Sequence, residues 1–110
     1  MSTRLPGAKY KTVFDRGRSV KGRLLVAWHY SATDADRQAG VVVSKKSFRH
    51  AVDRNRAKRL LREAYRLLAK DGEALEGTSW VFIGRAAIKG KSCAEVKEEM
   101  RRAMRKATNG

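Results

Sequence analysis

Cations and apolar residues are closely interleaved in the segment DRNRAKRLLREAYR, residues 53–66. The guanidinium group of arginine forms paired hydrogen bonds with phosphate oxygens and stacks on nucleobases, and lysine adds a compact positive charge. A solvated helix normally intersperses acids among its bases, but only Asp53 and Glu63 are available here. The segment therefore predicts phosphate recognition, and a merely solubilising charged face is the alternative.

A helical conformation divides this segment into two faces. At roughly 100° per residue, the apolar residues fall in one arc that predicts a core-facing stripe, Ala57, Leu60, Leu61, Ala64 and Leu68. Like charges one turn apart, such as Lys58 and Arg62, destabilise the free protein unless a polyanion compensates them. The polar arc lies opposite and consists of Asn55, Lys58, Arg59, Arg62 and Arg66.

Further cations precede the helix. Lys45, Lys46 and Arg49 follow the β-branched run VVV, so we expect them to extend the positive surface from the end of a strand. The helix and these three residues together predict one broad basic patch.

Three aromatic residues suggest a second surface. Tyr10 and Phe14 lie on one face of a predicted helix, and Trp28 lies in a predicted strand. Aromatic side chains beside cations hold single-stranded nucleic acid by stacking on its bases. The same residues are equally suited to fill the core of a small domain. Alternation along LLVAWHY, residues 24–30, does not decide which face of that strand packs against the helices.

The sequence contains no recognisable catalytic or metal-binding constellation. His29 and His50 lie in different elements without a signature partner, the acids are scattered, and Cys93 is the only cysteine. The stretch GRAAIKGKS, residues 84–92, ends like a phosphate-binding loop, but five residues separate its glycines instead of four. We therefore assign no catalytic and no metal-binding residue.

Composition points to a polyanionic partner. The chain has 110 residues, 42% of them hydrophobic, and a formal net charge of +15. Nucleic acid is the expected partner, and an anionic membrane is the competing possibility, for which the apolar runs are too short. A single cysteine and an N-terminus without an apolar stretch predict a cytoplasmic location.

The elements that must position these residues form a simple series. We expect one domain, residues 1–110, ordered as a helix, two or three strands, a helix, a strand and a helix. Ser92 and Glu95 predict a capping box at the start of the last helix. A mixed α/β sandwich, one sheet backed by helices, follows from this order. The first helix is expected within 6–17, and the strands at 23–30, 40–46 and 80–84. The basic helix covers 53–66 with an apolar stripe that reaches Leu68, and the last helix follows Ser92 with a stripe from Val96 to Ala107.

The order and identity of these segments resemble a known family. VVVSKK at 41–46 followed by AVDRNRAKRLLREAYR at 51–66 is similar to the signature of the bacterial ribonuclease P protein component, and YKTVFDRGRSV at 10–20 and WVFIGR at 80–85 support the match. The resemblance implies an α+β fold, an α-β sandwich with a mixed sheet of about four strands, three helices and a left-handed βαβ crossover.

The resemblance also implies a function. Members are non-catalytic partners of a catalytic RNA subunit, which removes the 5′ leader of precursor tRNA by hydrolysis that requires Mg²⁺ held mainly by the RNA. It implies no membrane and no obligate protein partner. By matching position, Tyr10, Phe14 and Trp28 would bind the leader. The surface for the RNA subunit would consist of Lys45, Lys46, Arg54, Asn55, Arg56, Lys58, Arg59 and Arg62.

Two departures and two alternatives accompany this interpretation. SFRH, residues 47–50, stands where many members have a glycine, which leaves the path of the chain into the helix open. Ser79 and Trp80 occupy a region that is often acidic in the family. A small basic ribosomal protein is the alternative function, because it shares the charge and the mixed fold. A nuclease that acts without RNA is a third reading, which the missing catalytic constellation argues against.

Overall fold

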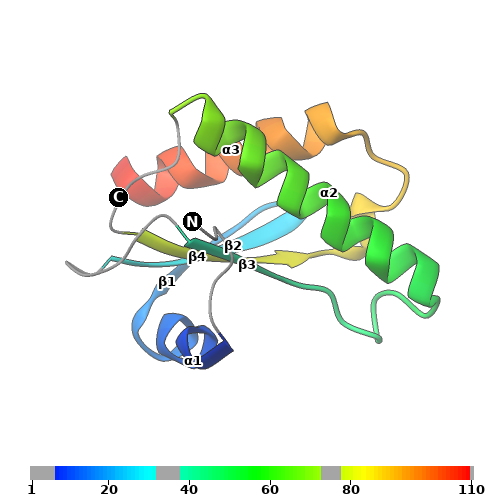
Figure 1. Cartoon of the computed structure of the whole chain (residues 1–110), viewed down its shortest axis with the longest axis horizontal. Helices are drawn as coiled ribbons and strands as arrows, with labels where there is room; N and C mark the ends of the chain where they lie inside the picture. The colour runs from blue at the N-terminus through cyan, green and yellow to red at the C-terminus, as the bar shows by residue number, and fades with distance from the viewer. Residues whose placement is uncertain (1–6, 32–37, 73–77, 110) are drawn as a thin grey trace.

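The computed structural model describes residues 7–31, 38–72 and 78–109, which form three helices, four strands and one short 3₁₀ helix (Figure 1). Helix α2 carries the basic segment, and α3 is the last helix. In chain order the elements are α1 (Gly7–Arg16), β1 (Arg18–Lys21), β2 (Leu25–Ser31), β3 (Gln38–Val42), α2 (Ala51–Lys70), β4 (Thr78–Gly84), η1 (Ala86–Ile88) and α3 (Cys93–Asn109).

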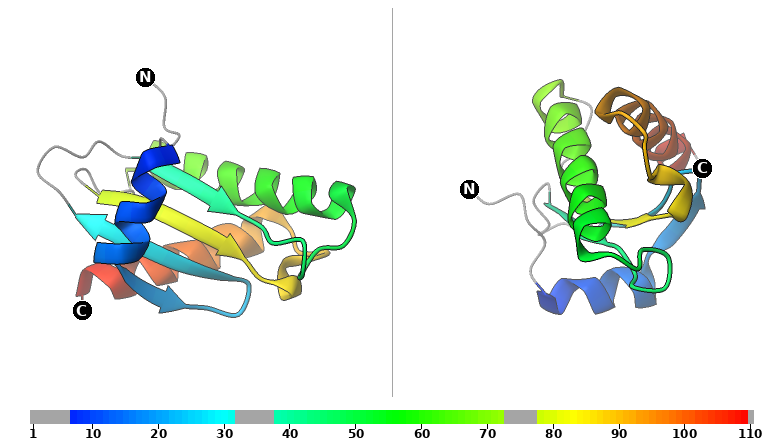
Figure 2. Two further views of the ribbon diagram at one scale, coloured as in Figure 1. Left: turned by 90° about the horizontal axis from the view of Figure 1, so that it is seen from below. Right: turned by 90° about the vertical axis from the view of Figure 1, so that its right-hand side faces the viewer.

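The four strands form one mixed sheet in the order β1-β2-β4-β3. β1 and β2 pair antiparallel, as do β2 and β4, whereas β3 and β4 pair in parallel. Helix α2 connects the two parallel strands, and Figure 2 shows that this connection is left-handed, against the strong right-handed preference of such units. The fold expected from the resemblance is therefore confirmed.

Helices cover both faces of the sheet. α2 and α3 lie side by side on one face, and α1 lies on the other (Figures 1 and 2). The larger core fills the space under α2 and α3, where Trp80 and Phe82 of β4 are fully buried. Val81, between them in sequence, points to the other face and packs with Val13 of α1. Because β4 is a central strand with both faces covered, the run Trp80–Ile83 within it is apolar.

Local sequence explains how α3 begins. The Ser92 hydroxyl accepts a hydrogen bond from the Glu95 N–H at 3.2 Å, and the Glu95 carboxylate accepts one from the Ser92 N–H at 2.8 Å. This reciprocal pair is the predicted capping box. The predicted apolar stripe of the helix is also confirmed, because Val96, Met100, Ala103 and Met104 are buried and Ala107 is partly buried.

The strand expected at 40–46 is displaced. β3 begins at Gln38 and ends at Val42, so Lys45 and Lys46 lie in a turn rather than at a strand end. The Ser44 carbonyl accepts the Phe48 N–H at 3.1 Å, and the Ser44 hydroxyl accepts the Ser47 N–H at the same distance. Local side-chain bonding of this kind competes with strand pairing and ends β3 early. It also defines the path of SFRH into α2.

The other boundaries differ by smaller amounts. α2 extends beyond the basic segment in both directions, from Ala51 to Lys70. β2 starts at Leu25 rather than at residue 23, because the two preceding residues form the turn after β1. β1 itself has no strong periodic signal in its four residues, RSVK, and exists through its pairing with β2. Gly17 lets α1 meet the sheet, since a Cβ there would overlap the carbonyl oxygens of Val13 and His29.

Candidate nucleic-acid interface

The inner face of α2 matches the predicted stripe. Ala57, Leu61, Ala64 and Leu68 are buried, and Leu60 is partly buried against the same core. The structure adds Tyr65, whose side chain is only 3% exposed and whose ring lies 5.7 Å from that of Phe82. Tyr65 lies four residues after Leu61 and so on the same face of the helix, and this spacing is the sequence signal that indicates its burial.

The outer face of α2 presents cations that no acid in the described part of the chain neutralises. Asn55, Arg56, Arg59 and Arg62 are exposed and Lys58 is partly exposed. Among the residues that the structure describes, none of these four cations makes a hydrogen bond or ion pair. The face is therefore available to an external anion.

Several cations outside this set are paired with acids within the protein. Arg66, one turn beyond Arg62, donates to both oxygens of Glu63, at 3.0 and 2.5 Å. On α3, Glu98 accepts from Arg101 at 2.6 Å and lies 3.7 Å from Arg102. Lys97 binds Asp71 at 2.9 Å. Arg66 is thus neutralised by a neighbouring acid of α2, unlike Arg62 one turn earlier.

Arg54 differs from its neighbours. Its Nη1 donates to the carbonyl oxygens of Phe48 at 2.9 Å and Arg49 at 3.2 Å, so the side chain ties the first turn of α2 to the preceding turn. The guanidinium group has five donors, and this bond pair engages only one nitrogen. Arg54 therefore lies beside the basic face while also supporting the segment that precedes it.

The turn before α2 is basic and firmly attached. Lys45, Lys46 and Arg49 are exposed, whereas Phe48 between them is fully buried. Lys89, in the segment after η1, lies with its Nζ 5.2 Å from the centre of the Phe48 ring, a cation–π contact. Lys89 belongs to the stretch GRAAIKGKS, whose local pattern gives no signal for a position beside the basic turn.

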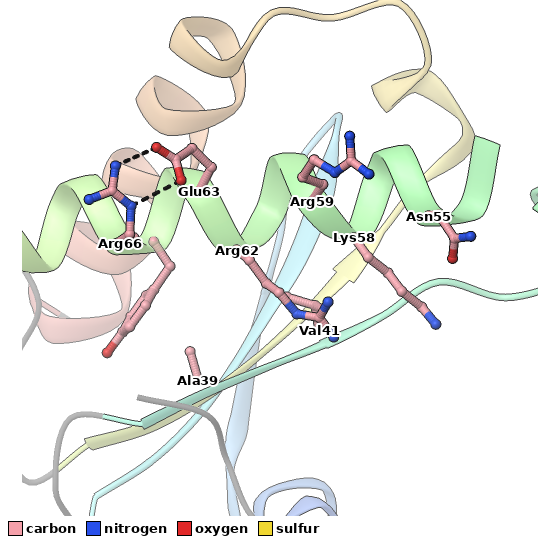
Figure 3. Close-up of a pocket in the computed structure, with 9 residues that line it drawn as sticks. Ala39, Val41, Asn55, Lys58, Arg59, Arg62, Glu63 and Arg66 are labelled. Atoms are coloured by element: carbon pink, nitrogen blue, oxygen red, sulfur yellow. Dashed lines mark hydrogen bonds and ion pairs between the residues drawn. The ribbon is translucent and has the colours of Figure 1, made fainter. Parts of the chain in front are cut away.

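A groove separates α2 from β3, which is an edge strand of the sheet (Figure 3). It has a volume of about 460 Å³. Figure 3 shows the side chains of Lys58 and Arg62 extending from the helix toward the strand, where Val41 lies. The residues that line the groove are Ala39, Val41, Asn55, Lys58, Arg59, Arg62, Glu63, Tyr65 and Arg66.

The three predicted aromatics gather on the opposite face of the sheet. Phe14 and Trp28 meet edge to face, with ring centres 5.3 Å apart and an interplanar angle of 81°. Phe14 is 36% exposed and Trp28 is partly exposed, so neither is a core residue. Tyr10, also partly exposed, packs over Gly40, where any Cβ would overlap its ring. We call Tyr10, Phe14 and Trp28 the aromatic cluster.

The alternation left open in β2 is now decided. Leu25 and Ala27 belong to the core under α2 and α3, whereas Trp28 and Tyr30 pack with the core under α1. The basic face and the aromatic cluster therefore lie on opposite sides of one sheet, and the structure does not bring the two predicted sets together.

The two histidines have separate surroundings. His29 lies 5.4 Å from the Trp80 ring, and burial, assisted by the nearby Arg18 charge, lowers the pKa of its imidazole below the usual 6.5. His50 is exposed and immediately precedes α2, where its side chain makes no capping hydrogen bond.

Ser79 and Trp80 are both buried in β4. In the described parts of the chain no three His, Cys, Asp or Glu residues come together as metal ligands. No helix in those parts is long and apolar enough to cross a membrane.

Comparisons with known proteins agree with one another. The family model described as Ribonuclease P matches residues 5–108. The ribonuclease P protein component of Clostridium kluyveri is 37% identical over 100 residues, which cover 91% of this chain and 88% of that protein. The component from Gluconacetobacter diazotrophicus is 39% identical over 101 residues, covering 91% and 85%.

Solved structures share the fold. The RNase P protein of Staphylococcus aureus matches with a TM-score of 0.80 at 23% identity, covering 97% of this chain and 96% of that one. The RNase P protein from Thermotoga maritima matches with a TM-score of 0.79 at 23% identity, covering 96% and 97%.

Proposed function

Because the chain belongs to the ribonuclease P protein family, we propose that its two surfaces bind two different RNAs. As a ribonuclease P protein component, it acts in tRNA 5′ maturation within the holoenzyme, and the ribosomal alternative loses its support. The basic face of α2 and the turn before it bind the catalytic RNA subunit. The aromatic cluster binds the single-stranded 5′ leader of precursor tRNA.

The observation that supports the first assignment is the set of four α2 cations, Arg56, Lys58, Arg59 and Arg62, that have no partner among the described residues. The RNA-subunit surface consists of Lys45, Lys46, Arg54, Asn55, Arg56, Lys58, Arg59 and Arg62, on adjoining parts of the fold. Phosphate contacts of this kind release condensed counterions, and the affinity then falls steeply with salt. Cations that are already paired with an acid, such as Arg66 with Glu63, contribute less to RNA affinity.

The assignment of the aromatic cluster to the 5′ leader is supported by the solvent exposure of its rings. Phe14 and Trp28 present ring surface to solvent, while Val13 beside them anchors α1 in the core. Aromatic surfaces stack on any base, so leader recognition is largely independent of sequence. A protein that binds RNA on both sides of a sheet holds the catalytic RNA and its substrate together.

The chemical step belongs to the RNA in this proposal. Mg²⁺ bound to the RNA subunit supplies the metal-assisted hydrolysis, and the described residues offer no cluster of three ligands for it. We assign no catalytic residue to the protein. Its cations neutralise phosphates and so lower the Mg²⁺ concentration at which the two RNAs associate. We place this activity in the cytoplasm, with no membrane and no obligate protein partner.

Cleavage of a 5′-extended precursor tRNA at low Mg²⁺ tests the proposal. The protein alone, a bacterial ribonuclease P RNA alone, and the mixture are compared. Efficient cleavage only in the mixture is expected. Lack of stimulation with an RNA that is active at high Mg²⁺ would contradict the proposed function, and cleavage by the protein alone would contradict the assignment of chemistry to the RNA.

The leader surface has its own test. Trp28→Ala is expected to weaken binding of precursor tRNA to the holoenzyme by about tenfold, because stacking on one base contributes about 1–3 kcal/mol. Binding of mature tRNA, which lacks the leader, is the control and should not change. Equal losses for both RNAs would contradict the leader assignment.

A further inference from the structure

The groove between α2 and β3 has an apolar floor and a cationic rim. Val41 is 9% exposed and Tyr65 is 3% exposed, and Ala39 is partly buried beside them. The Tyr65 ring packs on Phe82 in the core, so this floor is rigid. Lys58 and Arg62 lie above it (Figure 3), and neither has an acidic partner among the described residues.

The strand that borders the groove adds hydrogen-bonding groups. β3 pairs with β4 on one side only, and no described strand pairs with its other side. The outward N–H and C=O groups of an edge strand are available to a ligand. A planar group lying on Val41 would therefore meet backbone donors and acceptors at its edge.

The charge distribution in the groove limits the length of nucleic-acid chain that it can accept. Glu63 lines its far end and holds Arg66 in a bidentate ion pair, so that end carries no free positive charge. Phosphate is favoured at the end occupied by Lys58 and Arg62 and is disfavoured beside the Glu63 carboxylate. The volume of about 460 Å³ falls in the range of small-molecule sites, about 300–1,000 Å³.

We propose that this groove receives one unpaired nucleotide of the catalytic RNA subunit. Its base lies on Ala39, Val41 and Tyr65, and its phosphate binds Lys58 and Arg62. This inference rests on the proposed function, because it assumes that α2 faces the RNA subunit. It adds a site for an extruded base to the phosphate contacts proposed for the cations of α2. Unstacked bases are the parts of RNA that proteins recognise individually.

Filling the groove without changing charge provides the test. Ala39→Leu is expected to weaken binding to a bacterial ribonuclease P RNA by about tenfold while leaving the salt dependence unchanged, because no phosphate contact is lost. Arg62→Ala is expected to weaken binding and to reduce the slope of log affinity against log salt by about 0.7–0.9. Ala94→Leu, at an exposed position on α3, adds the same side chain elsewhere and should change neither quantity.

Chemical probing of the RNA gives a second measurement, and its wild-type arm does not depend on how the variants fold. At saturating wild-type protein, one unpaired nucleotide is expected to lose reactivity at its base. In the saturated Ala39→Leu complex that base should react again while the neighbouring backbone stays protected.

Two results separate this inference from the proposed function. If the wild-type protein binds the RNA, Ala39→Leu binds equally well and no unpaired base is protected, the groove proposal is overturned and the proposed function stands. If the wild-type protein neither binds nor stimulates the RNA, both are overturned.

Discussion

Arg54 and Arg59 belong to the same helix and the same proposed RNA surface, yet their surroundings differ. Arg59 is exposed and makes no hydrogen bond to any described residue, whereas Arg54 donates to two backbone carbonyls of the turn before α2. That turn carries Lys45 and Lys46. In the proposed RNA interface, Arg54 would therefore act partly by holding other cations in place.

Arg54→Lys tests this support role. A lysine keeps the positive charge but cannot reproduce the planar guanidinium geometry at both carbonyls. We expect the free energy of unfolding to fall by about 1–2 kcal/mol, measured by urea denaturation, and RNA affinity to fall with it. Arg59→Lys is the matched control and should change stability little. Equal stabilities for the two variants would show that the carbonyl contacts contribute nothing.

His29 gives stability a pH dependence. Burial against the sheet lowers its pKa below 6.5, so the unfolded chain binds more protons than the native protein just below that pH. Its contribution is complete above about pH 6.5 and is lost as the pH falls toward the lower native pKa. We expect the free energy of unfolding to decrease from pH 7 to pH 5, and His29→Gln to reduce that decrease. His50→Gln, at an exposed position, is the control, and an unaltered profile for His29→Gln would contradict the prediction.

At the scale of elements, one carboxylate of α3 forms hydrogen bonds with the sheet. Glu99 accepts the backbone N–H groups of Arg23, Leu24 and Leu25 at 3.1, 2.6 and 3.0 Å. These donors lie in the turn between β1 and β2, close to Gly22, whose missing Cβ leaves room for the Glu99 side chain. A charged acceptor on a helix thus fixes the geometry of the β1–β2 hairpin.

Glu99→Ala should destabilise the protein by about 2–3 kcal/mol, because it leaves partly buried N–H donors unsatisfied. Thermal or urea unfolding measures the change. Glu98→Ala, on the same helix, removes only exposed ion pairs to Arg101 and Arg102 and should cost at most about 1 kcal/mol. A loss for Glu99→Ala no larger than that of the control would contradict the proposed role of the turn contacts.

At the scale of the whole molecule, a net charge of +15 acts against compaction. Lys58 and Arg62 lie one helical turn apart, and neither has an acidic partner among the described residues. The two positive charges therefore repel each other in the free protein. Under the proposed function, RNA bound at this face would reduce the repulsion. The same charge distribution that favours association therefore lowers the stability of the unbound protein.

Sulfate should raise the melting temperature more than chloride at equal ionic strength, because it binds the native basic face in addition to screening it. The double variant Lys58→Gln/Arg62→Gln removes part of that face and should narrow the difference between the two salts. Replacement of exposed Lys106 and Arg102 by Gln is the charge-matched control. Identical responses in all three proteins would mean that sulfate does not bind at α2.

The sequence by itself determined the features that depend on nearby residues. The two faces of α2, the capping box of α3 and the apolar run of β4 follow from periodicity and short-range hydrogen bonding, which a single segment contains. The resemblance to ribonuclease P proteins rests on the same segments. The left-handed connection between β3 and β4 followed from that resemblance, since general rules of chain connection favour the opposite hand.

Only the tertiary structure decided what depends on residues far apart in the chain. The partnership of Glu99 with the β1–β2 turn spans more than 70 residues, and no local pattern encodes it. The face occupied by Trp28 was open because both faces of β2 are apolar, and the packing of α1 settled it. The groove exists because β3 lies at the edge of the sheet beneath α2. These features arise from the free energy of packing the whole chain, which short windows of sequence do not contain.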